Sequence, residues 1–394
     1  MRTVVIISFS NLARDPRVDR QIRAVLSIRD LSVVTIGLAE PAVPVSRHIA
    51  VVLPPRNLKR ILAIAHELLR RRYEEYYVLT YKPSRVISEL KDISVDLVIG
   101  NDLDSLPLAS QLAKIKNSRL LLDAHEYSPR QGEEKLLWRV FFQPYHYYLG
   151  RRYLPELDGM ITVSEGIARE YQRVFGIIPQ VITNAASFTE LLPNEVLQDR
   201  IRLVYHGAAA PARGIKKIIE AMNMVREGIT LDMLLMPVRG NEGYYHCLQR
   251  LVKGKKNVRI LPPIPMSELV AYCNNYDVGI CFLEYRNFNH KHALPNKFFE
   301  YIQSRLALLI GPSPEMMRYV LDYDLGKVAK DFTAQGLAQA INELTRESII
   351  AFKKNAHAAS KALSAESNRQ KLIKIVEELL ECSPTVLPHP KFLP

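Results

Sequence analysis

Short apolar runs that alternate with helix-like segments constrain the fold of this chain more than any other feature. In the first half they predict strands at residues 3–10, 32–37, 95–100, 119–123, 159–163 and 180–183. Several runs are rich in Val, Ile and Leu without polar alternation, as expected for parallel strands that are covered on both faces. Amphipathic segments lie between them, and one is predicted to begin at Pro16 with Asp15 as its N-cap. The first half therefore predicts a parallel sheet between layers of helices.

The same alternation restarts after a polar, proline-containing stretch at residues 192–200. It predicts strands at residues 201–206, 230–236, 258–261, 278–282 and 306–310, and a last helix over 347–381 ahead of a proline-rich tail. Two such series predict an α/β protein of two doubly wound, Rossmann-like domains that face each other across a cleft. We place these domains at residues 1–190 and 191–375, and expect residues 376–394 to pack back on the first domain as a tail.

Composition excludes several other classes of protein. The four cysteines form no C-x-x-C pair and do not cluster with histidines, which argues against a disulfide framework or a zinc site. No run reaches the roughly 20 apolar residues of a membrane span, and the N-terminus reads as a strand rather than a signal peptide. The formal charge of +12 is spread over both halves, so no nucleic-acid-binding tail is visible. We expect a cytoplasmic protein, soluble or peripheral to the inner face of the membrane.

The segment at residues 292–302, His-Ala-Leu-Pro-Asn-Lys-Phe-Phe-Glu-Tyr-Ile, combines a helix start with two charged side chains. Pro295 suits the first turn of a helix, and Lys297 and Glu300 are three residues apart, so they lie on one face. A helix start attracts phosphate, a lysine adds a cation, and a glutamate accepts hydrogen bonds from paired hydroxyls such as those of ribose. The alternative interpretation is an ordinary ion pair on a surface helix.

Two further segments follow predicted strands. After the strand at 201–206 comes a loop of small residues with Gly207, then Arg213 and Gly214 ahead of a predicted helix. Gly207 permits a close approach of backbone to a ligand, and Arg213 can grip a diphosphate, although neither a Walker loop nor G-x-G-x-x-G is present. His125 follows the strand at 119–123, where α/β enzymes place reacting groups. An ordinary loop and a structural histidine are the alternatives.

Seven pieces in order give the chain a resemblance to the retaining glycosyltransferase family 4. They begin at Asp15 (Asp-Pro-Arg-Val-Asp-Arg), Asn101 (Asn-Asp-Leu-Asp-Ser-Leu-Pro), Asp123 (Asp-Ala-His-Glu), Thr162 (Thr-Val-Ser-Glu), Ile182 (Ile-Thr-Asn-Ala), His206 (His-Gly, with Arg213-Gly) and Leu294 (Leu-Pro-Asn-Lys-Phe-Phe-Glu-Tyr). The resemblance covers almost the whole chain and implies the GT-B fold. It also implies transfer of a sugar from a nucleotide diphosphate sugar to a glycan, lipid-linked or small-molecule acceptor, in the biosynthesis of cell-surface polysaccharide or glycoconjugates.

The resemblance implies a role for individual residues. The donor-binding set would be Gly207, Arg213, Gly214, His292, Asn296, Lys297 and Glu300. Within it, Arg213 and Lys297 would hold the diphosphate and Glu300 would bind the ribose hydroxyls. His125 would contact the transferred sugar, which makes it a catalytic candidate together with Arg213 and Lys297. Phe9, Ser10 and Asn11 would form an N-terminal loop over the phosphates and acceptor, and Asn184 would lie near the interdomain hinge.

The chain departs from the family pattern in four places. His292 stands where the family often has the first of two glutamates, and Ala208 stands where an arginine is usual. The loop at 9–11 lacks the usual paired glycines, and residues 305–307 read Arg-Leu-Ala instead of Gly-x-Pro. The missing glutamate changes how the sugar hydroxyls are recognised, whereas the phosphate grip is kept.

The sequence singles out no pair of carboxylates for a double displacement. The family mechanism instead has the acceptor hydroxyl attack on the face from which the nucleotide leaves. Catalysis then depends on stabilising the departing diphosphate by Arg213, Lys297 and helix N-termini. Asp102 and Asp104 have metal-binding spacing but lie in the first domain, and we interpret them as a helix-start or loop feature. We therefore expect neither a metal nor another cofactor, and no nucleic acid.

Basic and apolar residues are mixed at residues 56–91, and aromatic residues at 138–148 run into Arg151 and Arg152. A surface of this kind suits an anionic membrane face, where polyprenyl-linked acceptors reside. The alternative is that the aromatic side chains form core and nearby glutamates dilute the charge. Two other functions also stay open: a degenerate relative that binds a nucleotide sugar or a partner transferase without catalysis, and a sugar-nucleotide epimerase.

Overall fold

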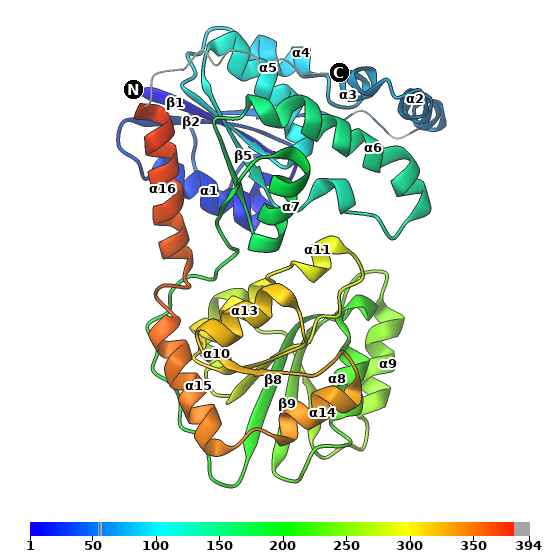
Figure 1. The fold of residues 1–394 in the computed structure, drawn as a ribbon, viewed down its shortest axis with the longest axis vertical. Coiled ribbons are helices and arrows are strands. Elements are labelled where there is room, and N and C mark those ends of the chain that lie inside the picture. The colour runs from blue at the N-terminus through cyan, green and yellow to red at the C-terminus, as the bar shows by residue number, and fades with distance from the viewer. Residues whose placement is uncertain (54, 56, 382–394) are drawn as a thin grey trace. The chain divides into compact units, whose positions relative to one another are not determined.

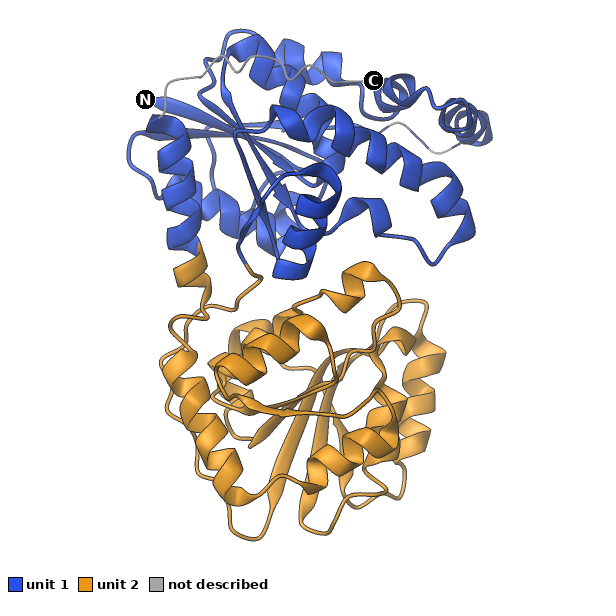
Figure 2. Cartoon of the chain, viewed as in Figure 1, with its two compact units in different colours: residues 1–182, 369–394 blue, residues 183–368 orange. Residues whose placement is uncertain are grey.

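The structure, a computed structural model, describes residues 1–53, 55 and 57–381. The chain forms two compact units, coloured separately in Figure 2. Unit 1 contains Met1–Ile182 and the C-terminal segment from Arg369, and unit 2 contains Thr183–Asn368. The proline-rich end of the predicted tail, from residue 382 on, lies outside the described residues.

Unit 1 is built on a parallel sheet with the strand order β3-β2-β1-β4-β5-β6-β7 (Figure 1). The strands are β1 (Arg2–Ile7), β2 (Leu31–Gly37), β3 (Arg47–Ala50), β4 (Leu97–Asn101), β5 (Arg119–Ala124), β6 (Gly159–Thr162) and β7 (Gln180–Val181). The helices are α1 (Pro16–Leu26), α2 (Leu58–Leu69), α3 (Tyr73–Tyr81), α4 (Pro83–Glu89), α5 (Leu106–Lys116), α6 (Leu136–Tyr153), α7 (Glu165–Phe175) and most of α16 (Ala365–Glu381).

Apolar strands buried on both faces hold this sheet in place. All six residues of β5 are buried, and they include Arg119 and Asp123 on either side of the apolar residues 120–122. On one face, α1 and α16 contribute to a shared core, for example through Ile22 and Val376. The predicted start of α1 is confirmed, because the Asp15 side chain accepts hydrogen bonds from the backbone N–H groups of Arg17 and Val18.

Unit 2 has a second parallel sheet, with the strand order β10-β9-β8-β11-β12-β13. The strands are β8 (Ile201–Ala208), β9 (Ile229–Met236), β10 (Val258–Leu261), β11 (Val278–Cys281), β12 (Ala307–Ile310) and β13 (Gly326–Val328). The helices are α8 (Ile215–Ala221), α9 (Glu242–Val252), α10 (Met266–Cys273), α11 (Phe288–Lys291), α12 (Asn296–Gln303), α13 (Pro314–Asp322), α14 (Ala334–Asn342) and α15 (Arg346–Ala359).

Two apolar clusters cover the faces of the second sheet. Helices α8, α9 and α14 pack on one face (Figure 1), and α10, α12 and α13 pack on the other. Because every paired strand runs parallel, the carboxyl ends of β8, β11 and β12 meet at one edge. The loops after β8 and β11 and the start of α12 are therefore available to form a ligand site.

The structure differs from the sequence prediction at the last helix. The helix predicted over residues 347–381 is in fact two helices, α15 and α16, separated by residues 360–364. The break contains neither proline nor glycine, so the apolar periodicity continues across it. Ser364 starts the new helix, because its hydroxyl accepts a hydrogen bond from the Ser367 backbone N–H.

The chain passes from unit 1 to unit 2 after residue 182 and returns to unit 1 after residue 368. Both crossings come earlier than the domain boundaries predicted from the sequence, which follow residues 190 and 375. Residues 183–190 have no regular structure and read as a linker, yet Ala185 packs in the core of unit 2.

The sequence did not predict the short strands β3 and β13, because runs of four and three residues carry little periodicity. Among the described residues, no helix is long and apolar enough to cross a membrane.

Candidate functional site

Small residues shape the end of β8, which contains Gly207, and the loop that follows it in unit 2. Gly207 has a φ of +134°, and Gly214, which precedes α8, has a φ of +66°. A Cβ atom on Gly214 would lie 3.2 Å from the Phe282 carbonyl oxygen after β11. Both positions therefore favour glycine, which keeps the loop close to the strand ends.

Lys297 brings the start of α12 against the end of β8. Its Nζ lies 3.8 Å from the ring centroid of Tyr205, and a Cβ on Gly207 would come within 3.2 Å of the same Nζ. The structure thus brings together Gly207 and Lys297, two residues of the predicted donor-binding set. Pro295 differs from the prediction only in register, because it is the N-cap of α12 rather than its first helical residue.

Glu300 lies one turn further along α12, beside His206 at the end of β8. Its Oε2 is 3.3 Å from the His206 Nε2, and only 8% of Glu300 is exposed. Burial, followed by the Lys297 ammonium, lowers the pKa of His206 to about 3, so the imidazole is neutral at physiological pH. The His206 Nε2 is buried and makes no hydrogen bond to any described residue. A polar ligand hydroxyl is the kind of group that such a pair can bind.

Arg213 adds a second cation to the same edge. It ends a short 3-10 turn, Pro211–Arg213, and is partly exposed. Burial raises the pKa of the Cys281 thiol to about 11, and the charges of Lys297 and Arg213 both oppose that rise. Both cations therefore lie near the carboxyl end of β11. Within the described part of the chain neither forms an ion pair, which leaves their charge available to an anion.

His292 and Asn296 lie at the junction of α11 and α12. The His292 Nδ1 is 3.0 Å from Oε1 of Glu315 on α13, and its ring lies against Phe288. The histidine that replaces the expected glutamate is therefore held by a buried carboxylate. Asn296 is the exposed first residue of α12.

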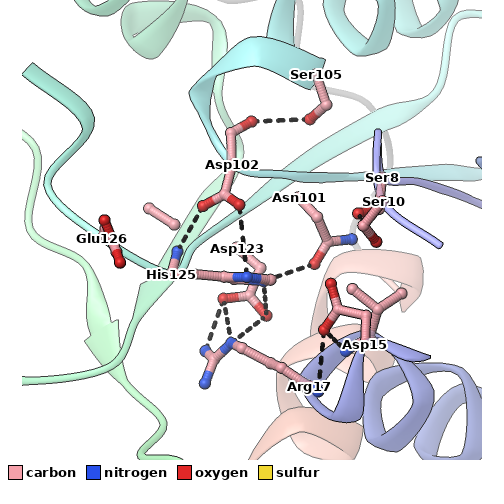
Figure 3. A network of polar contacts seen from close by, with 12 residues as sticks. Ser8, Ser10, Asp15, Arg17, Asn101, Asp102, Ser105, Asp123, His125 and Glu126 are labelled. Atoms are coloured by element: carbon pink, nitrogen blue, oxygen red, sulfur yellow. Dashed lines mark hydrogen bonds and ion pairs between the residues drawn. The ribbon is translucent and has the colours of Figure 1, made fainter. Parts of the chain in front are cut away.

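Unit 1 carries a polar network at the carboxyl ends of β4 and β5 (Figure 3). Arg17 of α1 forms a buried ion pair with Asp123, with Nη2 at 2.6 Å from Oδ1 and Nε at 3.0 Å from both carboxylate oxygens. Gln21 donates to the other Asp123 oxygen at 3.0 Å. The Asn101 amide nitrogen donates to Gln21 at 2.9 Å. The network ties α1 to both strands.

His125 is oriented by this network. The Asn101 amide nitrogen donates to Gln21, so the Asn101 Oδ1 is the acceptor that faces His125. The His125 Nε2 donates to this oxygen at 3.1 Å, and the ring proton therefore lies on Nε2. The His125 backbone N–H donates to Oδ1 of Asp102, whose Oδ2 is 3.5 Å from Nδ1. Asp102 has a φ of +60°, which is strained for a residue other than glycine. The surrounding protein displaces water and raises the pKa of Asp102, while His125 acts in the opposite direction.

The loop after β1 and the start of unit 2 carry the remaining predicted residues. Phe9 stacks on Tyr81 of α3, with ring centroids 4.2 Å apart. The Ser10 hydroxyl bonds to that of Ser8, and Asn11 forms a β-bridge with Ala39. Asn184 is the second residue of unit 2; its neighbour Thr183 accepts a hydrogen bond from Asn368 at the second crossing.

The sequence named no role for Arg17, Gln21 or Asp123, although Arg17 and Asp123 lie in two of the quoted motifs. Arg17 and Asp123 are more than a hundred residues apart, so only the fold reveals that they pair. The proximity of His206 to Glu300 was likewise not predicted. Among the described residues we find no cluster of His, Cys, Asp or Glu that could hold a metal ion.

No protein-family model matches the chain, and no curated protein matches it in sequence. Solved structures match it over nearly its full length. Sucrose-phosphate synthase from Thermosynechococcus elongatus gives a TM-score of 0.71 at 13% identity, covering 96% of this chain and 99% of that one. A glycosyltransferase from Rickettsia africae ESF-5 gives 0.69 at 14% identity, covering 96% and 99%. HepE from Anabaena, in complex with UDP, gives 0.67 at 13% identity, covering 96% and 100%.

Similarity at this level of identity shows the fold. Each unit has a parallel sheet covered by helices, as in the GT-B glycosyltransferases that match it. The predicted fold class, GT-B with two Rossmann-like domains, is confirmed.

Proposed function

We propose that the chain is a glycosyltransferase that moves a sugar from a nucleoside diphosphate sugar to an acceptor hydroxyl. The observation that carries the proposal is the group of side chains at the end of β8, where Lys297, Gly207 and the Glu300–His206 pair meet. Cations without a carboxylate partner suit a diphosphate, and a buried carboxylate suits paired ribose hydroxyls. The solved relatives add support, because HepE was crystallised with UDP.

In this proposal unit 2 binds the donor. Arg213 and Lys297 hold the diphosphate, Glu300 binds the ribose, and Gly207 and Gly214 let the backbone approach the ligand. Asn296 offers the exposed start of α12, and His292 contacts the donor through the ring edge that Glu315 does not hold. The donor is a substrate, and the mechanism requires no cofactor because these two cations supply the charge.

Unit 1 provides the acceptor side. Residues 9–11 form the loop over the acceptor, and His125, whose ring is held between Asn101 and Asp102 (Figure 3), contacts the transferred sugar. Asn184 lies at the hinge. We infer a retaining transfer of the family 4 type: the acceptor oxygen bonds to the anomeric carbon as the carbon–diphosphate oxygen bond breaks. The acceptor proton passes to the departing diphosphate, whose charge Arg213 and Lys297 stabilise.

The proposal places the protein in the cytoplasm, at the inner face of the membrane, in biosynthesis of cell-surface polysaccharide or glycoconjugates. Its acceptor is a glycan, a lipid-linked sugar or a small molecule. The basis is the combination of a nucleotide-sugar site with basic and aromatic residues on α2, α3 and α6. Proton NMR of the product tests the retaining assignment, because an inverted anomeric centre would contradict it.

Glu300→Ala is expected to weaken the best nucleotide ligand about 10- to 100-fold, because the ribose hydroxyls lose a buried acceptor. The measurement is thermal stabilisation by UDP-, GDP-, ADP- and CMP-sugars, which reports binding to the folded state. Glu343→Ala, an exposed glutamate after α14, is the control and keeps the wild-type shift. A panel in which no nucleotide stabilises the wild type would contradict donor binding.

Gly207→Ala is expected to weaken the same ligand by about tenfold or more, since a side chain at this φ is strained and its Cβ displaces Lys297. Gly240→Ala is a matched control: Gly240 also has a positive φ, but no atom lies within 4 Å of its would-be Cβ. Titration by calorimetry compares the two variants. Equal losses in both would mean that backbone strain, rather than the position of Lys297, sets affinity.

One observation favours a second function, binding without transfer. The side chain that replaces the expected glutamate, His292, is engaged by Glu315 and is not simply an exposed substitute. A protein of this kind would be stabilised by a nucleotide sugar and would never cleave it. Donor cleavage therefore separates the two functions.

A further inference from the structure

An apolar face of α2 is exposed although it has the spacing of a buried face. Leu58, Ile61, Leu62, Ala65 and Leu69 follow one another at helical intervals. Leu58 and Leu62 are 72% and 61% exposed. Single exposed leucines are common on protein surfaces, but a continuous apolar stripe marks a site of interaction.

The N-terminal half of α6 extends this apolar surface. Leu136 and Leu137 are 66% and 72% exposed, and Val140 is exposed one turn later. Side chains of α2 and α6 line a groove of about 670 Å³, whose members are Ile61, Ile64, Ala65, Leu68, Lys135, Leu136, Leu137, Trp138, Phe141 and Phe142. Figure 1 shows α2 and the start of α6 at the same end of unit 1. We call these residues, with Leu58, Leu62, Leu69 and Val140, the α2–α6 surface.

Basic side chains lie within the two helices of the α2–α6 surface or at their ends. Lys59, Arg70, Lys135 and Arg139 are exposed and, among the described residues, form no ion pair. A second pocket of about 620 Å³ follows along α6, lined by Arg71, Tyr73, Gln143, Pro144, Tyr147, Tyr148, Arg151 and Arg152. Apolar, aromatic and basic groups therefore succeed one another along α6 and the neighbouring helices α2 and α3.

We propose that the α2–α6 surface docks the protein onto an anionic phospholipid membrane. The exposed leucines enter the acyl region, Trp138 lies at the interface, and the basic side chains contact headgroup phosphates. This deepens the membrane contact in the proposed function, but rests on no residue of the donor site. A two-fold dimer through the same face would set the basic groups of both copies against each other, which opposes association.

The test uses the full chain and vesicles of phosphatidylcholine with about one third phosphatidylglycerol. Trp138 is the only tryptophan in the sequence, so its fluorescence reports on the groove itself. We expect the protein to pellet with these vesicles and its emission to shift to shorter wavelength. Lipids with brominated acyl chains should quench that emission. Vesicles of phosphatidylcholine alone should pellet far less protein.

Two pairs of substitutions separate insertion from charge. Leu136→Ser with Leu137→Ser should lower vesicle affinity at least about tenfold and abolish the Trp138 shift. Lys135→Glu with Arg139→Glu should lower binding to anionic vesicles by a similar factor. The controls are Leu321→Ser and Lys354→Glu with Lys361→Glu, exposed positions in unit 2, which should bind as the wild type does.

Three results would overturn the proposal: no pelleting at low salt, pelleting without any change at Trp138, or equal binding by surface and control variants. A concentration-dependent dimer that the leucine substitutions abolish would assign the groove to a second copy instead. Thermal stabilisation by nucleotide sugars is measured on the same variants. An unchanged shift there means that a failed docking result leaves the proposed transfer intact.

Discussion

Lys297→Ala is expected to slow sugar transfer by about 10²–10³-fold while the protein stays folded. The Lys297 ammonium lies over the Tyr205 ring beside Gly207, with no ion pair to any described residue. Its charge is therefore available to the diphosphate, and most needed when negative charge develops on the leaving group. Arg213→Ala should act in the same direction and range. The measurement is kcat and kcat/KM for transfer, with thermal unfolding to confirm the fold.

Lys216→Ala is the matched control for this prediction. Lys216 also places its ammonium over a tyrosine ring, that of Tyr244, at 5.6 Å. Removing it deletes a comparable cation–ring contact on α8 but no proposed phosphate ligand. Equal turnover in the Lys297→Ala, Arg213→Ala and wild-type proteins would contradict the diphosphate assignment.

Arg17→Ala is expected to lower the free energy of unfolding of unit 1 by about 3–5 kcal/mol, because it leaves Asp123 buried without its counter-charge. Asp123→Ala should cost a similar amount for the opposite reason. Arg23→Ala is the control on the same helix: its pair with Asp19 is exposed and should contribute about 1 kcal/mol or less. Denaturant unfolding followed by circular dichroism compares the three.

The paired substitution Arg17→Met with Asp123→Leu sharpens this test. It removes both charges and fills the site with apolar groups, so it should destabilise less than either single change. A single Arg17→Ala change no more costly than Arg23→Ala would show that the network does not hold α1 to the sheet. His125 would then lack the rigid support that its contact with Asn101 implies.

The sequence predicts those parts of the fold that local patterns determine. Apolar runs such as β5 and β8 identify strands because burial on both faces selects the same residue types. Helical spacing likewise predicts that Lys297 and Glu300 face one way, and the structure brings both to the end of β8. Glycine near the end of a strand indicates close approach, as Gly207 does next to Lys297.

Contacts between distant segments are where local pattern fails. The Arg17–Asp123 pair joins α1 to β5, and an isolated arginine or aspartate carries no sign of its partner. His206 and Glu300 lie on different elements and become neighbours only when α12 packs on the sheet. The break after α15 is hidden for a different reason, because a serine cap replaces the usual proline or glycine.

Release of nucleoside diphosphate from the donor that best stabilises the protein separates sugar transfer from binding alone. The reaction is run with oligosaccharide and lipid-extract acceptors, and the wild type is compared with Lys297→Ala. We expect release that rises with acceptor and falls by about 10²–10³-fold in the variant. A donor that binds tightly but yields nucleoside diphosphate at the same background rate with both proteins would contradict transfer and identify a binding protein.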